Sequence, residues 1–121
     1  MLVNGVIDTD NETCIRIDEA VTIAADPVFN SLVGDCDAAA PFNGTSGATT
    51  AQVQSEFVAG SNNNASFTIT LTAGYINGSN ENGVPAFNAN SLSTFFDTTT
   101  FIGAAQNAAS SRFGNWTCNS S

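Results

Sequence analysis

The stretch TCIRIDEAVTIAADPVFNSLVGDC, residues 13 to 36, carries most of the information about the expected fold. Its first half alternates, with isoleucine or valine at positions 15, 17, 21 and 23 and mostly polar residues between them. A period of two is typical of a half-buried β-strand. The Asp26-Pro27 pair interrupts this pattern, and a second short apolar run follows at residues 28–36. We therefore expect short strands on both sides of the break.

Two cysteines, Cys14 and Cys36, flank these apolar runs. A bridge between them is plausible and would stabilise the fold by roughly 3 kcal/mol through the loop that it closes. Cys118 is then unassigned, and three states stay open for it: a free thiol, a bond to one of the other two cysteines, or a lost partner. The absence of lysine and the richness in asparagine and threonine suggest an extracytoplasmic protein, either secreted, periplasmic or on the cell surface, where disulfides persist.

Three later segments also carry structural signals. Residues 49–60, TTAQVQSEFVAG, predict a helix, because Thr49 and Gln52 fit a capping box and Gly60 can end the helix. Residues 66–72, SFTITLT, alternate so regularly that they predict the clearest strand of the chain. In NANSLSTFFD, Asn90 is placed to cap a short helix, after which TTTFIGA returns to extended structure.

The composition limits the functions that this chain can have. Its 121 residues suffice for one domain, with 42% hydrophobic residues and a net charge of −9. With two arginines, no lysine and no histidine, the surface repels phosphate, so we expect no nucleic-acid partner. We also expect no insertion into a membrane, because no apolar run is long enough to span one. Cations, neutral glycans and other proteins remain compatible partners.

Most of the chain resembles the tails of large bacterial surface or secreted proteins that are mostly uncharacterised. The similarity rests on FFDTTTFIGA at residues 95–104 and on FGNWTC at residues 113–118, and it extends back to about Cys14. Those tails end in GWT or GWTC, whereas Asn115 here separates the glycine from Trp116. Many such proteins are predicted to be right-handed parallel β-helices, although their repetitive rungs are absent from this sequence.

The resemblance implies a mainly β fold of β-helix or solenoid type with one or two short helices. From the length, we expect residues 1–121 to form a single domain, and the resemblance implies that it is the C-terminal part of a longer protein. An open β-helix end exposes apolar interior and unpaired backbone, so it needs an aromatic cap. The residues expected to form this cap are Phe95, Phe96, Phe101, Ile102, Phe113 and Trp116. The expected partner is the rest of such a chain, or a second copy through self-association.

Acidic residues offer the other candidate sites. Asp8, Asp10 and Glu12 alternate in DTDNE, a spacing compatible with a calcium loop, although a solvated acidic edge explains it more simply. Without histidine or lysine, the catalytic option that remains is a pair of carboxylates acting on glycans. The neighbouring acids Asp18 and Glu19 would point to opposite faces of a strand. Asp35 and Asp37 would share a face, but they flank Cys36.

These observations favour a non-catalytic structural or adhesion-type domain of an extracytoplasmic bacterial protein, with no cofactor unless calcium binds. Two alternatives stay open: a small carboxylate-dependent hydrolase that acts on glycans, and a module that binds calcium or a neutral glycan.

Overall fold

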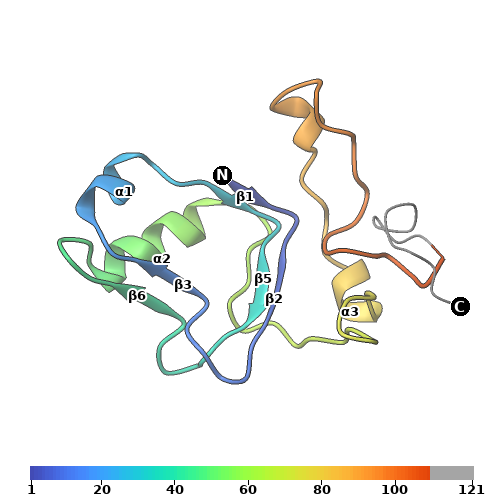
Figure 1. Ribbon diagram of the computed structural model, residues 1–121, viewed down its shortest axis with the longest axis horizontal. Coiled ribbons are helices and arrows are strands. Elements are labelled where there is room, and N and C mark those ends of the chain that lie inside the picture. Colours follow the sequence, from blue (N-terminus) through green and yellow to red (C-terminus); the bar gives the residue numbers. More distant parts are fainter. Residues whose placement is uncertain (110–121) are drawn as a thin grey trace, which may run out of the picture.

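The computed structural model describes residues 1–109, which form a small mixed domain (Figure 1). Its strands are two or three residues long and pair in parallel. β1 (Leu2–Val3) pairs with β4 (Phe29–Asn30), β2 (Val6–Asp8) with β5 (Val33–Asp35), and β3 (Ile15–Ile17) with β6 (Phe42–Gly44). The remaining elements are α1 (Ala20–Ala24), α2 (Thr50–Ala59), α3 (Ser79–Asn82) and a 3₁₀ turn, η1 (Ala89–Ser91).

All three strand pairs have the same offset along the chain. Leu2 lies opposite Phe29, Val6 opposite Val33, and Ile15 opposite Phe42. Residues 2–17 therefore run beside residues 29–44 in the same direction. Parallel strands need a long crossover connection, and the chain between the two stretches, including α1, supplies it.

The expected β-helix fold is wrong. The described residues contain separate two-stranded pairs, with no closed sheet and no solenoid of stacked rungs. Beyond β6, strand pairing with this layer is limited to single bridges such as that between Val33 and Asn64. The fold is better described as a small mixed domain of short parallel pairs and helices.

The main core lies between the strand pairs and α2. Its buried side chains are Ile15, Ile17, Phe29, Leu32, Phe42, Ala48, Val53 and Phe57. The Phe57 ring lies 5.0 Å from that of Phe42 and 6.1 Å from that of Phe29, measured between centroids. Burying one such side chain contributes about 1.5–3 kcal/mol, so this aromatic group holds α2 against the strands.

The helix predicted at residues 49–60 is confirmed. Thr49 Oγ1 accepts a hydrogen bond from the Gln52 backbone N–H at 3.1 Å, and Gln52 Oε1 accepts one from the Thr49 N–H at 2.9 Å. This capping box satisfies backbone donors that the first helical turn leaves free. Val53 and Phe57, one turn apart, are the buried residues of the helix.

The alternating pattern at residues 15–23 is only partly a strand. Ile15–Ile17 forms β3, whereas Ala20–Ala24 forms α1. The backbone N–H of Ala25 donates to the Val21 carbonyl, so this part satisfies its hydrogen bonds locally. No strand lies beside residues 20–24 in the described chain, and without such a neighbour the extended form leaves its backbone groups unpaired.

The strand predicted at residues 66–72 is wrong as well. The Thr70 backbone N–H donates to Glu81 Oε1 at 2.6 Å, and the Thr68 carbonyl accepts from Asn80 Nδ2 at 3.0 Å. Side chains of α3 thus take the backbone groups that a neighbouring strand would otherwise bind. The predicted Asn90 cap also shifts, because η1 begins after Asn88, whose side chain accepts from the Asn90 N–H.

Candidate functional site

A cleft lies between β1 and the segment that follows η1. Its volume is about 620 Å³. Figure 1 shows the segment around residue 90, in orange, extending away from the rest of the domain. The lining residues are Val3, Asn4, Ala89, Phe96, Asp97, Thr98, Thr99, Thr100 and Phe101.

Asn4 connects the two walls of this cleft. Its Nδ2 donates to the Phe87 carbonyl at 2.9 Å and to Thr99 Oγ1 at 3.2 Å. Its Oδ1 accepts from the Phe87 backbone N–H at 2.6 Å, and its own carbonyl accepts from the Gly103 N–H at 2.8 Å. Asn4 has a φ of 57°, a left-handed conformation that asparagine tolerates better than most residues. One residue of the N-terminal strand layer therefore positions a segment almost one hundred residues further along the chain.

The rim of the cleft is aromatic and open to solvent. Phe95 is 86% exposed and Phe96 is 47% exposed. The two rings meet edge to face with centroids 5.6 Å apart, a favourable aromatic geometry. A single exposed apolar residue is ordinary on a protein surface, whereas adjacent exposed apolar residues that form a patch often mark a contact surface.

The expected cap residues therefore separate into different environments. Ile102 is fully buried and Phe101 is half-buried, whereas Phe95 and Phe96 face solvent. Because the fold has no stack of rungs, the phenylalanine pair has no open β-helix end to cover. Phe113 and Trp116 lie outside the described residues, as does Cys118.

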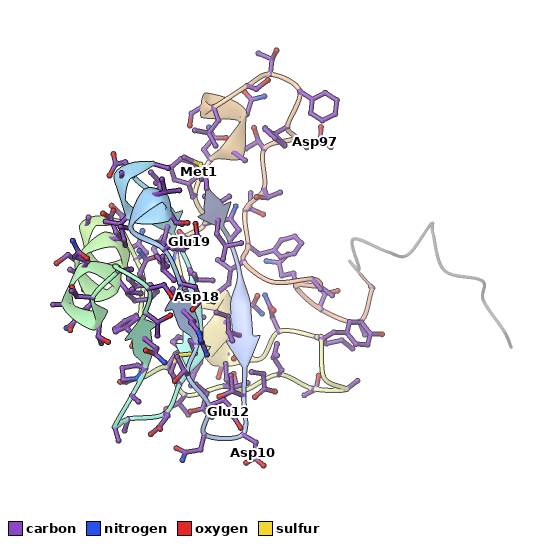
Figure 2. The ribbon with its side chains drawn as sticks, turned by 60° about the vertical axis from the view of Figure 1, so that its left-hand side comes forward. Met1, Asp10, Glu12, Asp18, Glu19 and Asp97 are labelled. Carbon is purple, nitrogen blue, oxygen red and sulfur yellow. A yellow bond between two sulfur atoms is a disulfide. The ribbon has the colours of Figure 1, made fainter. Side chains whose placement is uncertain are left out.

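Asp97 is the single ionisable residue among the described residues that line the cleft, and none of those residues is basic. In Figure 2, Asp97 lies at one end of the molecule, while Asp10 and Glu12 lie at the opposite end. Within residues 1–109, no three His, Cys, Asp or Glu side chains are grouped so that they could hold a metal ion. A calcium site at Asp8, Asp10 and Glu12 stays a prediction.

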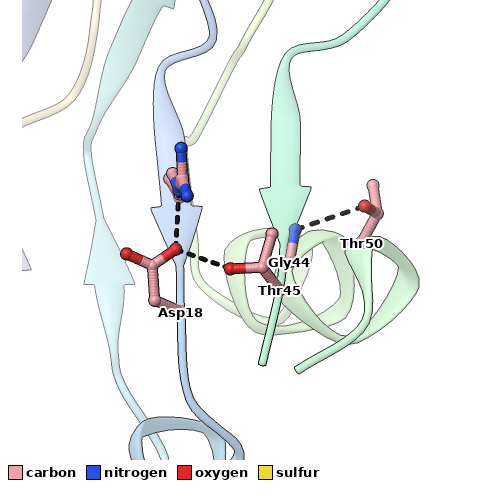
Figure 3. Close-up of polar contacts among 5 residues, drawn as sticks. Asp18, Gly44, Thr45 and Thr50 are labelled. Carbon is pink, nitrogen blue, oxygen red and sulfur yellow. Dashed lines mark hydrogen bonds and ion pairs between the residues drawn. The ribbon is translucent and has the colours of Figure 1, made fainter. Parts of the chain in front are cut away.

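Asp18 takes part in a small polar network on the surface (Figure 3). Its Oδ1 accepts from Arg16 Nε at 2.6 Å and from Thr45 Oγ1 at 2.8 Å. These hydrogen bonds, that from Arg16 first, lower the pKa of Asp18 below its usual value. Such an acid stays ionised at neutral pH and is a poor proton donor, which argues against Asp18 as the acid of a glycosidase pair.

The other acids of the two candidate catalytic pairs are Glu19, Asp35 and Asp37, and they lie at or near the surface. Glu19 precedes α1 and is exposed. Asp35 is exposed at the end of β5, and Asp37 Oδ1 accepts from the Ala39 backbone N–H at 2.9 Å. Between these two acids, Cys36 forms a disulfide with Cys14, with Cα atoms 5.4 Å apart.

Glu81 is a buried carboxylate that the sequence reasoning missed. Its side chain is 0% exposed, and its oxygens accept from the Thr70 N–H and Thr70 Oγ1, both at 2.6 Å, and from the Gly78 N–H at 2.8 Å. Burial raises the pKa of Glu81, but the hydrogen bonds from Thr70, Gly78 and its own backbone outweigh burial and keep the pKa below its usual value. This carboxylate is a structural group that orders residues 70–81.

Asn4 was also missed. The one local signal in the sequence was Asn4-Gly5, a pair that is typical of turns. Neither that pair nor the sequence NENG around Glu81 indicates which distant backbone groups the side chain will bind.

Comparisons with known proteins identify no relative: no protein family, no curated protein and no solved structure matches this chain. Within the described part of the chain, no helix has the length and apolar character needed to cross a membrane.

Proposed function

We propose that this chain is a non-catalytic, adhesion-type domain of an extracytoplasmic bacterial protein. The observation that carries the proposal is the exposed Phe95–Phe96 pair at the rim of the cleft, on a segment that Asn4 holds in place. Exposed aromatic residues supply large contact area at a small cost in conformational entropy, which is why they dominate protein contact surfaces.

The Cys14–Cys36 bridge supports a location outside the cytoplasm, where disulfides persist. The composition agrees, because a chain with no lysine and a net charge of −9 avoids anionic partners such as nucleic acids. Self-association through the phenylalanine pair, and attachment to the remainder of a longer chain, fit the same surface.

A glycan hydrolase is the weaker candidate. Glycosidases of the usual kind place two carboxyl groups about 5–9.5 Å apart on either side of the scissile bond. Asp97 is the single carboxylate among the described residues that line the cleft, and Glu81, the buried acid, has both its oxygens occupied by hydrogen bonds. The arrangement therefore supports binding better than it supports acid–base chemistry.

Attachment of chain-coated beads to cell layers tests the proposal. Beads that carry the 121-residue chain should attach under gentle flow, and a Phe95→Ala/Phe96→Ala variant should attach at least about tenfold less, because two exposed rings of the contact surface are removed. Val58→Ala is the matched control, since Val58 is also an exposed apolar residue but lies on α2. Equal attachment of the double variant and the wild type, or no attachment by either, would refute the adhesion role.

A further inference from the structure

We propose that the cleft between β1 and residues 96–101 is a binding site for a neutral saccharide. The inference rests on the adhesion role and adds the chemical class of the ligand. It is carried by the cleft's size, by its charge and by the way polar and aromatic side chains are placed around it.

The cleft has the size of a ligand site. Its volume of about 620 Å³ falls within the range of about 300–1,000 Å³ that is typical of small-molecule sites. Phe96 and Asp97, which line it, are both exposed, so a segment of a longer glycan can reach them without a change in the fold.

The charge of the cleft selects among ligands. Asp97 is its one ionisable group in the described chain, and no basic side chain among the described lining residues balances it. A phosphate, sulfate or sialic acid would meet an uncompensated carboxylate on a chain whose net charge is −9. A neutral ligand rich in hydroxyl groups is complementary, because each hydroxyl can donate to the carboxylate, and hydrogen bonds to a charged acceptor are the stronger ones.

The polar groups suit a polyol in number and kind. Thr98, Thr99 and Thr100 follow Asp97 directly, and each threonine hydroxyl both donates and accepts. Thr98 and Thr100 are exposed, so their hydroxyls are open to a ligand, whereas Thr99 accepts from Asn4. A sugar hydroxyl also donates and accepts hydrogen bonds, so it can pair with a threonine hydroxyl in either direction.

Phe96 supplies the apolar part of the site. One face of a pyranose ring presents C–H groups with a small positive charge, and an aromatic face is electron-rich, so the two attract each other when stacked. The Phe95 and Phe96 rings meet edge to face, so Phe95 adds apolar surface next to Phe96. The bonds from Asn4 to Phe87 and Thr99 hold both ends of this segment before a ligand arrives, which lowers the entropic cost of binding.

The experiment is a multivalent array of neutral oligosaccharides built from glucose, galactose, mannose or N-acetylglucosamine, beside sulfated and sialylated counterparts. The full chain should bind at least one neutral oligosaccharide and bind its anionic counterpart more weakly. The best neutral oligosaccharide is then titrated in solution by calorimetry. Phe96→Ala and Asp97→Asn should each weaken its binding about tenfold or more, as expected for the loss of a stacking ring or of a charged acceptor.

Two control variants keep the result specific. Asp26→Asn removes the same charge from an exposed residue that does not line the cleft, and Val58→Ala removes an exposed apolar side chain from α2. Both should bind as the wild type does. All four variants should keep the wild-type melting temperature, because the substituted side chains are exposed.

Three results would overturn the inference: no neutral oligosaccharide binds, an anionic one binds best, or Phe96→Ala and Asp97→Asn bind as well as the controls. These results are separable from the bead assay. If beads attach through the phenylalanine pair but free neutral oligosaccharide does not compete, the adhesion role stands and the saccharide site is wrong.

Discussion

Replacing Glu81 with glutamine tests the role of the buried carboxylate. Glutamine has nearly the same shape, but its amide nitrogen cannot accept a hydrogen bond. In either orientation, the amide nitrogen faces one of the backbone N–H groups of Thr70 and Gly78 that now donate to the carboxylate. The substitution therefore leaves a buried donor unsatisfied and turns the remaining charged hydrogen bonds into neutral ones.

The expected loss of stability follows from these contacts. One unsatisfied buried donor costs about 1–3 kcal/mol, and each hydrogen bond that loses its charged acceptor is weakened by about 1 kcal/mol. The free energy of unfolding of Glu81→Gln should thus fall by about 3 kcal/mol. For a chain of this size, that corresponds to a melting temperature lower by about 12 °C.

Urea unfolding, followed by circular dichroism with the disulfide intact, measures this loss. The transition midpoint of Glu81→Gln should fall by roughly 1.5 M at pH 7, with an unchanged slope. Glu12→Gln is the matched control, because Glu12 is exposed, and its midpoint should stay close to that of the wild type. A Glu81→Gln midpoint as high as that of the control would refute the reasoning.

The same pair of proteins shows a defined pH dependence. Hydrogen bonds lower the pKa of folded Glu81 relative to its ordinary value of 4.5, so its contribution is complete above about pH 4.5 and is lost as the pH falls through the folded pKa. The wild type therefore loses stability in acid, and the difference between wild type and Glu81→Gln should narrow below about pH 4. Asp18, whose pKa is also lowered, is present in both proteins and cancels in the comparison.

Three further predictions concern other contacts. Reduction of the Cys14–Cys36 bridge, or its replacement by two alanines, should lower the free energy of unfolding by about 3 kcal/mol, measured by urea titration with and without reductant. Asn4→Gly retains the left-handed backbone but removes the amide bonds to Phe87, so hydrogen exchange at the Phe87 N–H should accelerate, whereas exchange within α2 should not. Gly60→Ala would drive its Cβ into the Phe29 carbonyl oxygen, so we expect little folded protein on expression, and a soluble variant with a wild-type melting temperature would contradict the described packing.

The success or failure of the sequence predictions depended on the range of the interactions involved. Helix α2 was predictable because its capping box, apolar spacing and final glycine all lie within twelve residues. The segment at residues 66–72 has an equally clear period of two but forms no strand, because a strand also needs a neighbour. Here the side chains of Glu81 and Asn80, rather than a neighbouring strand, bind the backbone groups of Thr70 and Thr68. The alternation of apolar and polar residues therefore did not predict the local structure.

The candidate site shows the same limit. Phe95, Phe96 and Phe101 stood out in the sequence as a cluster of large aromatic residues near the C-terminus. We expected them to cover the open end of a strand stack. Whether an aromatic residue is buried depends on what lies above it, and the structure leaves Phe95 and Phe96 open to solvent. Asn4, which holds the other wall of the cleft, lies too far away in the sequence for any local pattern to connect it with Thr99.

The sequence by itself determined the chemistry that this protein has to work with: strong negative charge, no histidine or lysine, aromatic residues near the C-terminus, and a capped helix in the middle. These properties follow from residue identity and from interactions within a few turns of chain. The tertiary structure alone decided that residues 2–17 lie beside residues 29–44, that Glu81 is buried and hydrogen-bonded, and that Asn4 lines a cleft with residues 96–101. Each of these pairings joins groups distant in the sequence, and their free energy depends on the burial and hydrogen bonding that exist only after the chain has folded.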